Sequence, residues 1–487
     1  MLAGLEPKKA FGFFEEISRI PRGSDNEKGI SDYFIAFAKE RGLWAHQDEA
    51  LNAIIKKPGT KGYEGAAPVI LQAHMDMVCE KNAGTAHDFE KDPIKLIVEG
   101  DIIRADGTTL GADNGASVAM ALALLDSDDI PHPPLEVLFT ACEEAGMTGA
   151  RAVDGSMFES KMLLNMDSGN EGSFCVSCAG GGRVFMTYAA ERREIPAGHV
   201  VKTVKVRGLK GGHSGNDILK ERGNSIRILA RVLWILRSKF DMQIADINGG
   251  MKENAIPREA QAVIAFDGAM VGEVADEVKR IAGVFKSEYA RSDEGLEFYL
   301  DDYASDFKKA FAQSLASDIV MALLAIPNGV QAMSLIFDGL PETSLNIGVV
   351  TTTEDSVVIA SSARSSVDSR KEMIIDQVKA IAAATGASVK EVGLYSAWEY
   401  NEKSALRKKA MQVFAQMCGK DAVIRGSHGG LECGLLRERI PGVDIVSFGP
   451  DIHDLHTPNE TLSISSFART WDFLLKLLVA LAEESRA

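Results

Sequence analysis

The stretch LQAHMD, residues 71–76, places a histidine and an aspartate at the end of a short apolar run. Four later segments also put acidic residues or a histidine next to a small residue or a turn. They are GADNG around Asp113, ACEEAG around Glu143 and Glu144, NMDSG around Asp167, and DLHTPNE around His456. Imidazole and carboxylate groups suit zinc and similar divalent ions, and a bridging carboxylate can hold two such ions ~3.5–4 Å apart. The five segments therefore predict the ligand set of a two-metal hydrolase.

Length, composition and charge are those of a globular protein. The 487 residues exceed what one ordinary core accommodates, so we expect two domains. A hydrophobic content of 46% with 25% charged residues is typical of globular chains. The net charge of −16 argues against nucleic acid or an anionic membrane as a partner.

Neither the N-terminal residues nor the cysteines predict export. The opening MLAGLEPKKAFGFFEE contains no continuous apolar core of the kind that a signal peptide has, and no apolar run of about 20 residues could span a bilayer. Six cysteines are few for this length and do not predict a disulfide framework. We therefore expect a cytoplasmic protein.

Three short apolar runs, residues 68–73, 135–140 and 162–166, predict buried strands. His74, the Glu143–Glu144 pair and Asp167 each follow one of these runs, at the carboxyl end of a strand, where open α/β sheets bind ligands. Asp113 lies in a glycine-rich turn just before an apolar helix expected over 116–125. The expected fold class is α/β, with a mostly parallel mixed sheet between helices.

A polar, turn-rich segment, AAERREIPAGH over residues 189–199, breaks this alternation and predicts a domain boundary at or just before it. We expect the catalytic domain to comprise residues 1–186 and 394–487, with its last helix over 466–483. An inserted α+β lid domain is expected over residues 187–393.

Within the insert, strand and helix patterns occur in two rounds. The expected strands are 200–207, 258–266, 332–337 and 344–361, and the expected helices are 218–238, 271–290 and 371–385. Asn254-Ala-Ile and Asn346-Ile-Gly occupy similar places in the two rounds. This weak internal repeat predicts that the insert is duplicated.

The order His-x-Asp, Asp, Glu-Glu, Asp, His resembles that of the M20 family of dinuclear zinc amidohydrolases and peptidases. Further segments resemble its aminoacyl-histidine dipeptidase branch, also called Xaa-His or carnosinase-like dipeptidases. These segments are FFEEISRIPRGS, LQAHMDMVCEKN, GADNGASVAMALALL, FTACEEAGMTGA and the late HGGLECG. The resemblance spans nearly the whole chain, with no departure at a ligand position. It implies a zinc-peptidase-like catalytic domain that hydrolyses unblocked dipeptides and favours histidine at the C-terminal position.

The resemblance also implies two divalent metal ions. Zinc is the expected metal, and cobalt and manganese are the alternatives. His74 and Asp167 resemble the ligands of one ion, Glu144 and His456 resemble those of the other, and Asp113 resembles the bridging carboxylate.

Two further residues are expected to be catalytic. Asp76 would accept the second N–H of His74 and so fix the tautomer of that ligand. Glu143 would be the general base, which takes a proton from the attacking water and hands it to the leaving amine.

Five residues resemble substrate contacts of the family. His213, in GGHSG, resembles a histidine that stabilises the tetrahedral oxyanion. Arg364, in SSARSS, resembles an arginine that clamps the substrate carboxylate. Asn254, in ENAIP, resembles a residue that holds the substrate backbone, and His428 and Gly429, in SHGGLE, are expected to line the pocket near the C-terminal residue of the substrate.

Two alternative functions also agree with these motifs. The first is another M20 amide hydrolase, such as a tripeptidase or an aminoacylase. The second is a metal-binding regulatory protein without catalysis, although the intact Glu143 argues against it. Relatives with a single insert dimerise through it, whereas a doubled insert could perform that packing within one chain. A homodimer and a monomer are therefore both compatible with the sequence.

Overall fold

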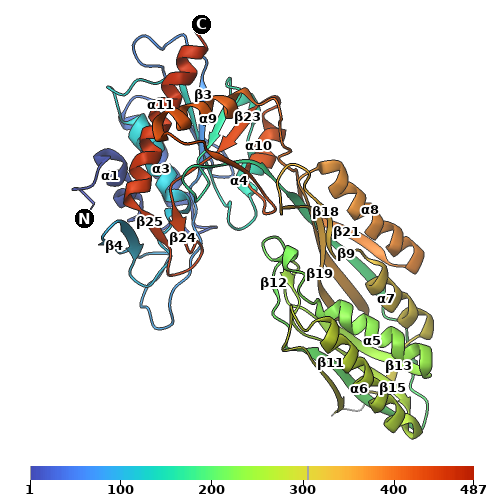
Figure 1. Ribbon diagram of the computed structural model, residues 1–487. Helices are drawn as coiled ribbons and strands as arrows, with labels where there is room; N and C mark the ends of the chain where they lie inside the picture. Colours follow the sequence, from blue (N-terminus) through green and yellow to red (C-terminus); the bar gives the residue numbers. More distant parts are fainter. Residues whose placement is uncertain (1, 304–306, 487) are drawn as a thin grey trace. The chain divides into compact units, whose positions relative to one another are not determined.

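The computed structural model describes residues 2–303 and 307–486 and divides the chain into two compact units (Figure 1). The first unit contains the chain up to Cys178 together with 400–426 and the chain from Leu431 onward. The second unit comprises Ala179–Glu399 with the short segment Ser427–Gly430. It thus begins before the expected boundary at 187 and ends after the one at 393. The reason is that strand β9 (Gly180–Ala189) pairs along its whole length with a strand of the second unit, so the polar segment 189–199 follows this strand.

The first unit is built on an eight-stranded mixed sheet. Its order is β1 (Trp44–Gln47), β2 (Ala53–Lys57), β6 (Leu135–Thr140), β3 (Val69–His74), β7 (Met162–Asn165), β23 (Asp444–Ser447), β8 (Ser173–Cys178) and β22 (Val423–Ser427). The four central strands β6, β3, β7 and β23 run parallel, whereas β1, β2 and β8 pair in antiparallel fashion. The sheet is mixed as expected, but its parallel part is confined to the centre.

Helices cover this sheet. They are α1 (Lys8–Ile17), α2 (Lys28–Glu40), α3 (Ala112–Leu125), the short α4 (Thr148–Ala152), α9 (Ala405–Cys418), α10 (Cys433–Arg439) and α11 (Ile464–Glu484). Almost every residue of α3 is buried, which suits a helix that is apolar on all sides, and α3 packs between α1 and strand β3. A small sheet of β4 (Leu96–Glu99), β5 (Ile102–Ala105), β25 (Thr461–Ser463) and β24 (Ile452–His453) completes the unit. Among the described residues, no helix is long and apolar enough to cross a membrane.

The three strands predicted to carry ligands are confirmed as β3, β6 and β7. Strands β3 and β6 are buried at every position, as expected for strands inside a parallel sheet covered on both faces. Because these strands are mutually parallel, their carboxyl ends meet at one edge of the sheet. His74 is the last residue of β3, Glu143 follows the end of β6, and Asp167 follows the end of β7.

The second unit has one nine-stranded sheet with a mirrored order. The path is β16 (Glu297–Asp302), β11 (His199–Arg207), β15 (Ala260–Asp267), β13 (Met242–Gly249), β19 (Pro341–Thr352), β20 (Ser356–Ser365), β9 and β21 (Ser388–Tyr395), with β18 (Gly329–Met333) paired to β19. Outward from the junction of β13 with β19, each half holds a hairpin partner, a long strand and an outer strand. This is the arrangement that a repeat predicts, and the duplication itself stays an interpretation.

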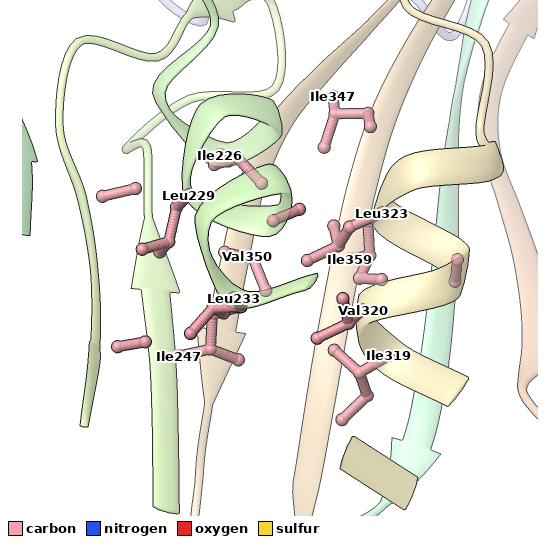
Figure 2. Packing of buried hydrophobic residues seen from close by; sticks show 14 of the residues in the cluster. Ile226, Leu229, Leu233, Ile247, Ile319, Val320, Leu323, Ile347, Val350 and Ile359 are labelled. Carbon is pink, nitrogen blue, oxygen red and sulfur yellow. The ribbon is translucent and has the colours of Figure 1, made fainter. Parts of the chain in front are cut away.

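Four helices pack on this sheet to form the core of the second unit. They are α5 (Ser225–Lys239), α6 (Val271–Glu288), α7 (Gln313–Ala325) and α8 (Asp368–Thr385). Figure 2 shows side chains of α5 and α7 converging on the central strands. The labelled residues are Ile226, Leu229 and Leu233 of α5, Ile319, Val320 and Leu323 of α7, and Ile247, Ile347, Val350 and Ile359 of the strands.

Three predicted elements of the second unit differ from the structure. The helix expected over 218–238 begins only at Ser225, where the Asn224 side chain accepts the N–H groups of two first-turn residues. The strand expected over 344–361 is two antiparallel strands, β19 and β20, joined by a turn at 353–355. The strand expected over 332–337 ends at Met333 and belongs to β18.

Candidate metal centre and active site

The structure brings together all five predicted metal ligands of the first unit. The carboxylate of Asp113 lies at the centre: its Oδ1 is 3.1 Å from His74 Nε2, and its Oδ2 is 3.3 Å from His456 Nε2. Asp113 and Asn114 depart from helical geometry at the start of α3, so the carboxylate sits in the predicted turn. One carboxylate thus faces two imidazoles with its two oxygens, as a bridging ligand must.

Two groups of three ligand atoms share Asp113. In the first group, His74 Nε2 is 3.6 Å from Asp167 Oδ1. In the second, His456 Nε2 is 2.9 Å from Glu144 Oε1. The ligand atoms within each group lie within 4.8 Å of one another, which is the spacing expected around a divalent ion.

The buried Oε1 of Glu144 supports this fit. Although it lies 2.9 Å from the imidazole of His456, it accepts no well-aligned hydrogen bond from the described residues. Two ligands of a common cation make such a contact without hydrogen bonding to each other. His74, Glu143 and Glu144 form a third possible group, so the carboxylate of Glu143 lies close to the same ligands.

Two residues of the site have strained backbones. Cys142, directly before Glu143, has φ of 55°, and His456 has φ of 62°. The left-handed region is uncommon for residues other than glycine, and such strain collects at functional sites, where the surrounding structure enforces it. Here the strained residues lie on two loops: Cys142 and Glu143 follow strand β6, and His456 lies between strands β24 and β25.

Crowding of carboxyl groups shifts their protonation. Burial raises the pKa of Glu143 well above its usual range, and burial raises the pKa of Asp167 to about 6, in both cases against the opposing effect of His74. Burial would also raise the pKa of Asp113, but hydrogen bonds from His456 and His74 hold it below its usual range. The adjacent carboxylates of Asp113 and Glu144 raise the pKa of His456 to about 10. The raised pKa values show that this cluster of acids and histidines binds protons readily. A divalent ion would supply the same positive charge.

Asp76 links His74 to the loop that carries both glutamates. Its Oδ1 lies 3.3 Å from His74 Nδ1. The same carboxylate accepts the backbone N–H of Glu143 at 3.0 Å, that of Glu144 at 3.2 Å, and the hydroxyl of Ser24 at 2.8 Å. Asp76 can therefore set both the orientation of the imidazole and the path of the glutamate loop.

Glu432 is a buried acid that sequence reasoning did not single out. Its carboxyl group is fully buried and accepts hydrogen bonds of 2.6 Å from both Gln72 Nε2 and Thr140 Oγ1, on strands β3 and β6. Burial raises the pKa of Glu432 to about 8. The segment HGGLECG contains it, but nothing in the letters indicates that this glutamate is buried behind the ligand strands.

In the second unit, His213, Arg364 and His428 form a cluster. His213 Nδ1 accepts the backbone N–H groups of Gly215 and Asn216 at 3.2 Å, so its Nε2 carries the proton. Burial and the charge of Arg364 lower the pKa of His213 and lower the pKa of His428 to about 4. Both imidazoles are therefore neutral donors or acceptors at neutral pH, and Arg364 is the charged member.

The remaining predicted contacts have backbone roles near this cluster. The carbonyl of Asn254, an exposed residue, accepts the N–H of Ser214 beside His213, at the short ribbon of β12 (Gly212–His213) and β14 (Ala255–Ile256). The N–H of Gly429 donates to Ser427 Oγ. The side chain of His428, by contrast, forms a hydrogen bond of 2.7 Å between its Nε2 and the hydroxyl of Ser344.

Residues 70–480 match the sequence pattern of peptidase family M20/M25/M40. The chain belongs to this family. This confirms the family that the sequence motifs predicted, and the protein is accordingly a peptidase, a hydrolase of peptide bonds.

Relatives match along nearly the full chain. Cytosol non-specific dipeptidase of Escherichia coli is 38% identical over 477 residues, which is 98% of each chain. The crystal structure of aminoacylhistidine dipeptidase from Vibrio alginolyticus has a TM-score of 0.89 at 38% identity and covers 99% of this chain and 98% of its own. The aminopeptidase PepT from Bacillus cereus, at 17% identity and a TM-score of 0.57, shares the fold and covers 98% and 99% of the two chains.

The shared carboxylate of Asp113 leads to a prediction about metal content. Wild-type protein should hold close to two divalent ions per chain, and Asp113→Asn should lose at least one, because each ligand group depends on that carboxylate. Elemental analysis by mass spectrometry after gel filtration measures this. Asp154→Asn, at an exposed aspartate that caps a short helix, is the matched control and should keep both ions. Two ions in Asp113→Asn would contradict a bridging role.

Proposed function

We propose that the protein is a metal-dependent dipeptidase that hydrolyses unblocked dipeptides, with Xaa-His dipeptides as preferred substrates. The observation that carries the proposal is the single carboxylate of Asp113 between two imidazoles, with the carboxyl of Glu143 beside the same ligands. Such a site suits hydrolysis, because two neighbouring metal ions can activate a water molecule and polarise the carbonyl that it attacks.

We assign His74 and Asp167 to one ion, Glu144 and His456 to the other, and Asp113 to both. Mixed imidazole and carboxylate donors suit zinc, and cobalt or manganese can occupy similar donor sets. When bound, the two ions would lower the pKa of a water molecule and polarise the scissile carbonyl.

Glu143 is the general base of this proposal. Its carboxylate takes a proton from the attacking water and transfers it to the nitrogen of the leaving amine. Burial raises the pKa of Glu143, and a cation bound beside it would lower that pKa and favour the ionised form that accepts the proton. Asp76 supports both groups by holding His74 and the N–H groups of the glutamate loop.

The cluster in the second unit provides groups of the kind that bind a dipeptide. We propose that the neutral His213 donates its Nε2–H to the developing oxyanion, because both backbone donors occupy Nδ1. Arg364 would clamp the free carboxylate of the substrate with its planar guanidinium. Asn254, His428 and Gly429 are proposed to hold the substrate backbone and to line the pocket of the C-terminal residue.

The choice of dipeptides rests on the two relatives at 38% identity. The name of the Vibrio protein indicates aminoacylhistidine substrates, and the name of the Escherichia coli protein indicates broad action on dipeptides. The latter name also supports our proposal of a cytoplasmic location.

A substrate panel tests this function. Free dipeptides should be hydrolysed, with Xaa-His dipeptides fastest, and N-acylated dipeptides and tripeptides should react much more slowly, because the site would bind both free ends of a dipeptide. Liberated amino acids are measured with and without a chelator. Faster cleavage of tripeptides or of N-acylated substrates would replace the proposal with one of the other amide hydrolases.

Glu143→Gln tests the general base. This substitution should keep the metal ions yet lower kcat by ~10²–10⁴-fold, which is the usual contribution of general base catalysis. Glu144→Gln is the contrasting variant and should lose metal. Metal content and kcat are measured on the same preparations. If Glu143→Gln loses an ion instead, the roles of the two neighbouring glutamates are exchanged.

Arg364→Ala tests the carboxylate clamp. The substitution should raise KM for free dipeptides roughly 10–100-fold, in line with the ~1.5–3 kcal/mol of a charged hydrogen-bonded pair, with a much smaller effect on the matching dipeptide amides. The control is Arg370→Ala, which removes an ion pair with Glu342 in the same unit. Equal losses on acid and amide would show that Arg364 does not bind the carboxylate.

A further inference from the structure

Arg22 is a buried arginine that touches both ligand-bearing segments. Its side chain is 2% exposed. Nη1 donates to the carbonyl of Met75 at 3.0 Å and to that of Asp76 at 3.1 Å, and Nη2 donates to the carbonyl of Gly111. One guanidinium therefore ties the segment that follows His74 to the turn that precedes Asp113.

Glu460, a residue of opposite charge to Arg22, binds the N–H groups of the same turn. Also 2% exposed, it accepts four consecutive backbone N–H groups. Oε2 accepts those of Leu110 at 2.9 Å and Gly111 at 3.1 Å, and Oε1 accepts those of Ala112 at 2.8 Å and Asp113 at 3.2 Å. Because Glu460 lies four residues after His456 in the chain, it connects the segment of one ligand to the backbone of another.

The glycines of this turn leave room for Arg22. A Cβ built on Gly111 or on Gly115 would lie 2.6 Å from Arg22 Nη2, and Gly111 also has φ of 70°. A side chain at either position would push the guanidinium away from the turn. The spacing of glycines in GADNG therefore reflects the approach of Arg22 as well as the shape of the turn.

Such buried charges are a poor source of stability. Desolvation of two buried charges often cancels their attraction, and apolar replacements of similar volume can be equally stable or more so. Arg22 and Glu460 instead bind seven backbone groups of two ligand segments, and such bonds fix the geometry of those segments. The seven groups are the carbonyls of Met75, Asp76 and Gly111 and the N–H groups of Leu110, Gly111, Ala112 and Asp113.

We propose that Arg22 and Glu460 are positioning residues that hold Asp113 in its bridging position and thereby set the metal affinity of the centre. Both act through the backbone of the ligand segments, and neither is itself a ligand. The inference rests on the metal centre proposed above. Groups that orient ligands typically contribute 10–100-fold to metal affinity, and a shared carboxylate magnifies any displacement because it serves two ligand groups.

The test measures zinc binding by the full-length protein after removal of metal. Arg22→Lys and Glu460→Gln are compared with two matched variants of the first unit. Arg407→Lys changes another buried arginine that donates to two carbonyls, and Glu136→Gln changes another buried glutamate that accepts backbone N–H groups. Zinc affinity is obtained by competition with a chromophoric chelator, and the Tm of each metal-free variant is recorded.

The two positioning variants should bind zinc about 10–100-fold more weakly than wild type, and activity lost at low zinc should return as zinc is raised. The two control variants should lower Tm to a similar extent while keeping wild-type zinc affinity. Gly115→Ala, which displaces the guanidinium and keeps its charge, should weaken zinc binding in the same direction and serves if Arg22→Lys does not fold. Glu460→Asp serves in the same way for Glu460.

Wild-type zinc affinity in the positioning variants, or an equal loss in the controls, would overturn the proposal. The measurement needs no hydrolysis, so it separates the two proposals. A wild-type chain that binds zinc but cleaves no dipeptide overturns the proposed function alone, whereas a wild-type chain that binds neither zinc nor cobalt nor manganese overturns both.

Discussion

Repulsion between closely spaced, half-buried carboxylates is the constraint on which the first unit depends. Asp113, Glu144 and Asp167 have ligand atoms within a few ångströms of two imidazoles, and Glu143 lies beside them. Like charges at this spacing cannot all ionise in a half-buried site without a source of positive charge. The raised pKa values of Glu143, Asp167 and His456 express that imbalance. A fold that assembles such a group therefore needs support from other residues, and a bound cation would balance the negative charge.

The support consists mainly of backbone hydrogen bonds from polar side chains outside the ligand set. Asp76 holds the N–H groups of the glutamate loop, Glu460 holds those of the Asp113 turn, and Arg22 holds carbonyls of both ligand segments. Rigid parallel strands bring the segments to one edge, and these three side chains then define where each loop goes. The position of each candidate ligand thus depends on residues far from it in the chain. Arg22, near the N-terminus, and Glu460, near His456, both bind the turn that carries Asp113.

In the second unit, the cluster around Arg364 has lowered rather than raised pKa values. Its cluster contains one arginine and two imidazoles, and burial and the charge of that arginine lower the pKa of both imidazoles. A neutral histidine can donate a hydrogen bond to a developing negative charge without binding a proton beforehand. The local positive charge of Arg364 also matters in a chain with a net charge of −16, because the overall field repels anionic ligands at long range.

The sequence by itself determined the family, the strands at the candidate metal centre and the types of residue that follow them. Apolar runs of six residues bounded by turns predict β3 and β6, because a buried strand needs apolar side chains along its length. Periodic patterns predict α6, α8 and α11, because burial of one helix face requires apolar residues at regular spacing. The sequence did not reveal that 344–361 is a hairpin, since the turn at 353–355 lacks glycine and proline between two apolar runs. Only the tertiary structure decided the burial of Arg22, Glu432 and Glu460. Charged residues are usually solvated. The partners of Arg22 and Glu460 are backbone groups, which carry no side-chain signal, and the partners of Glu432 are Gln72 and Thr140, on strands far from it in the chain.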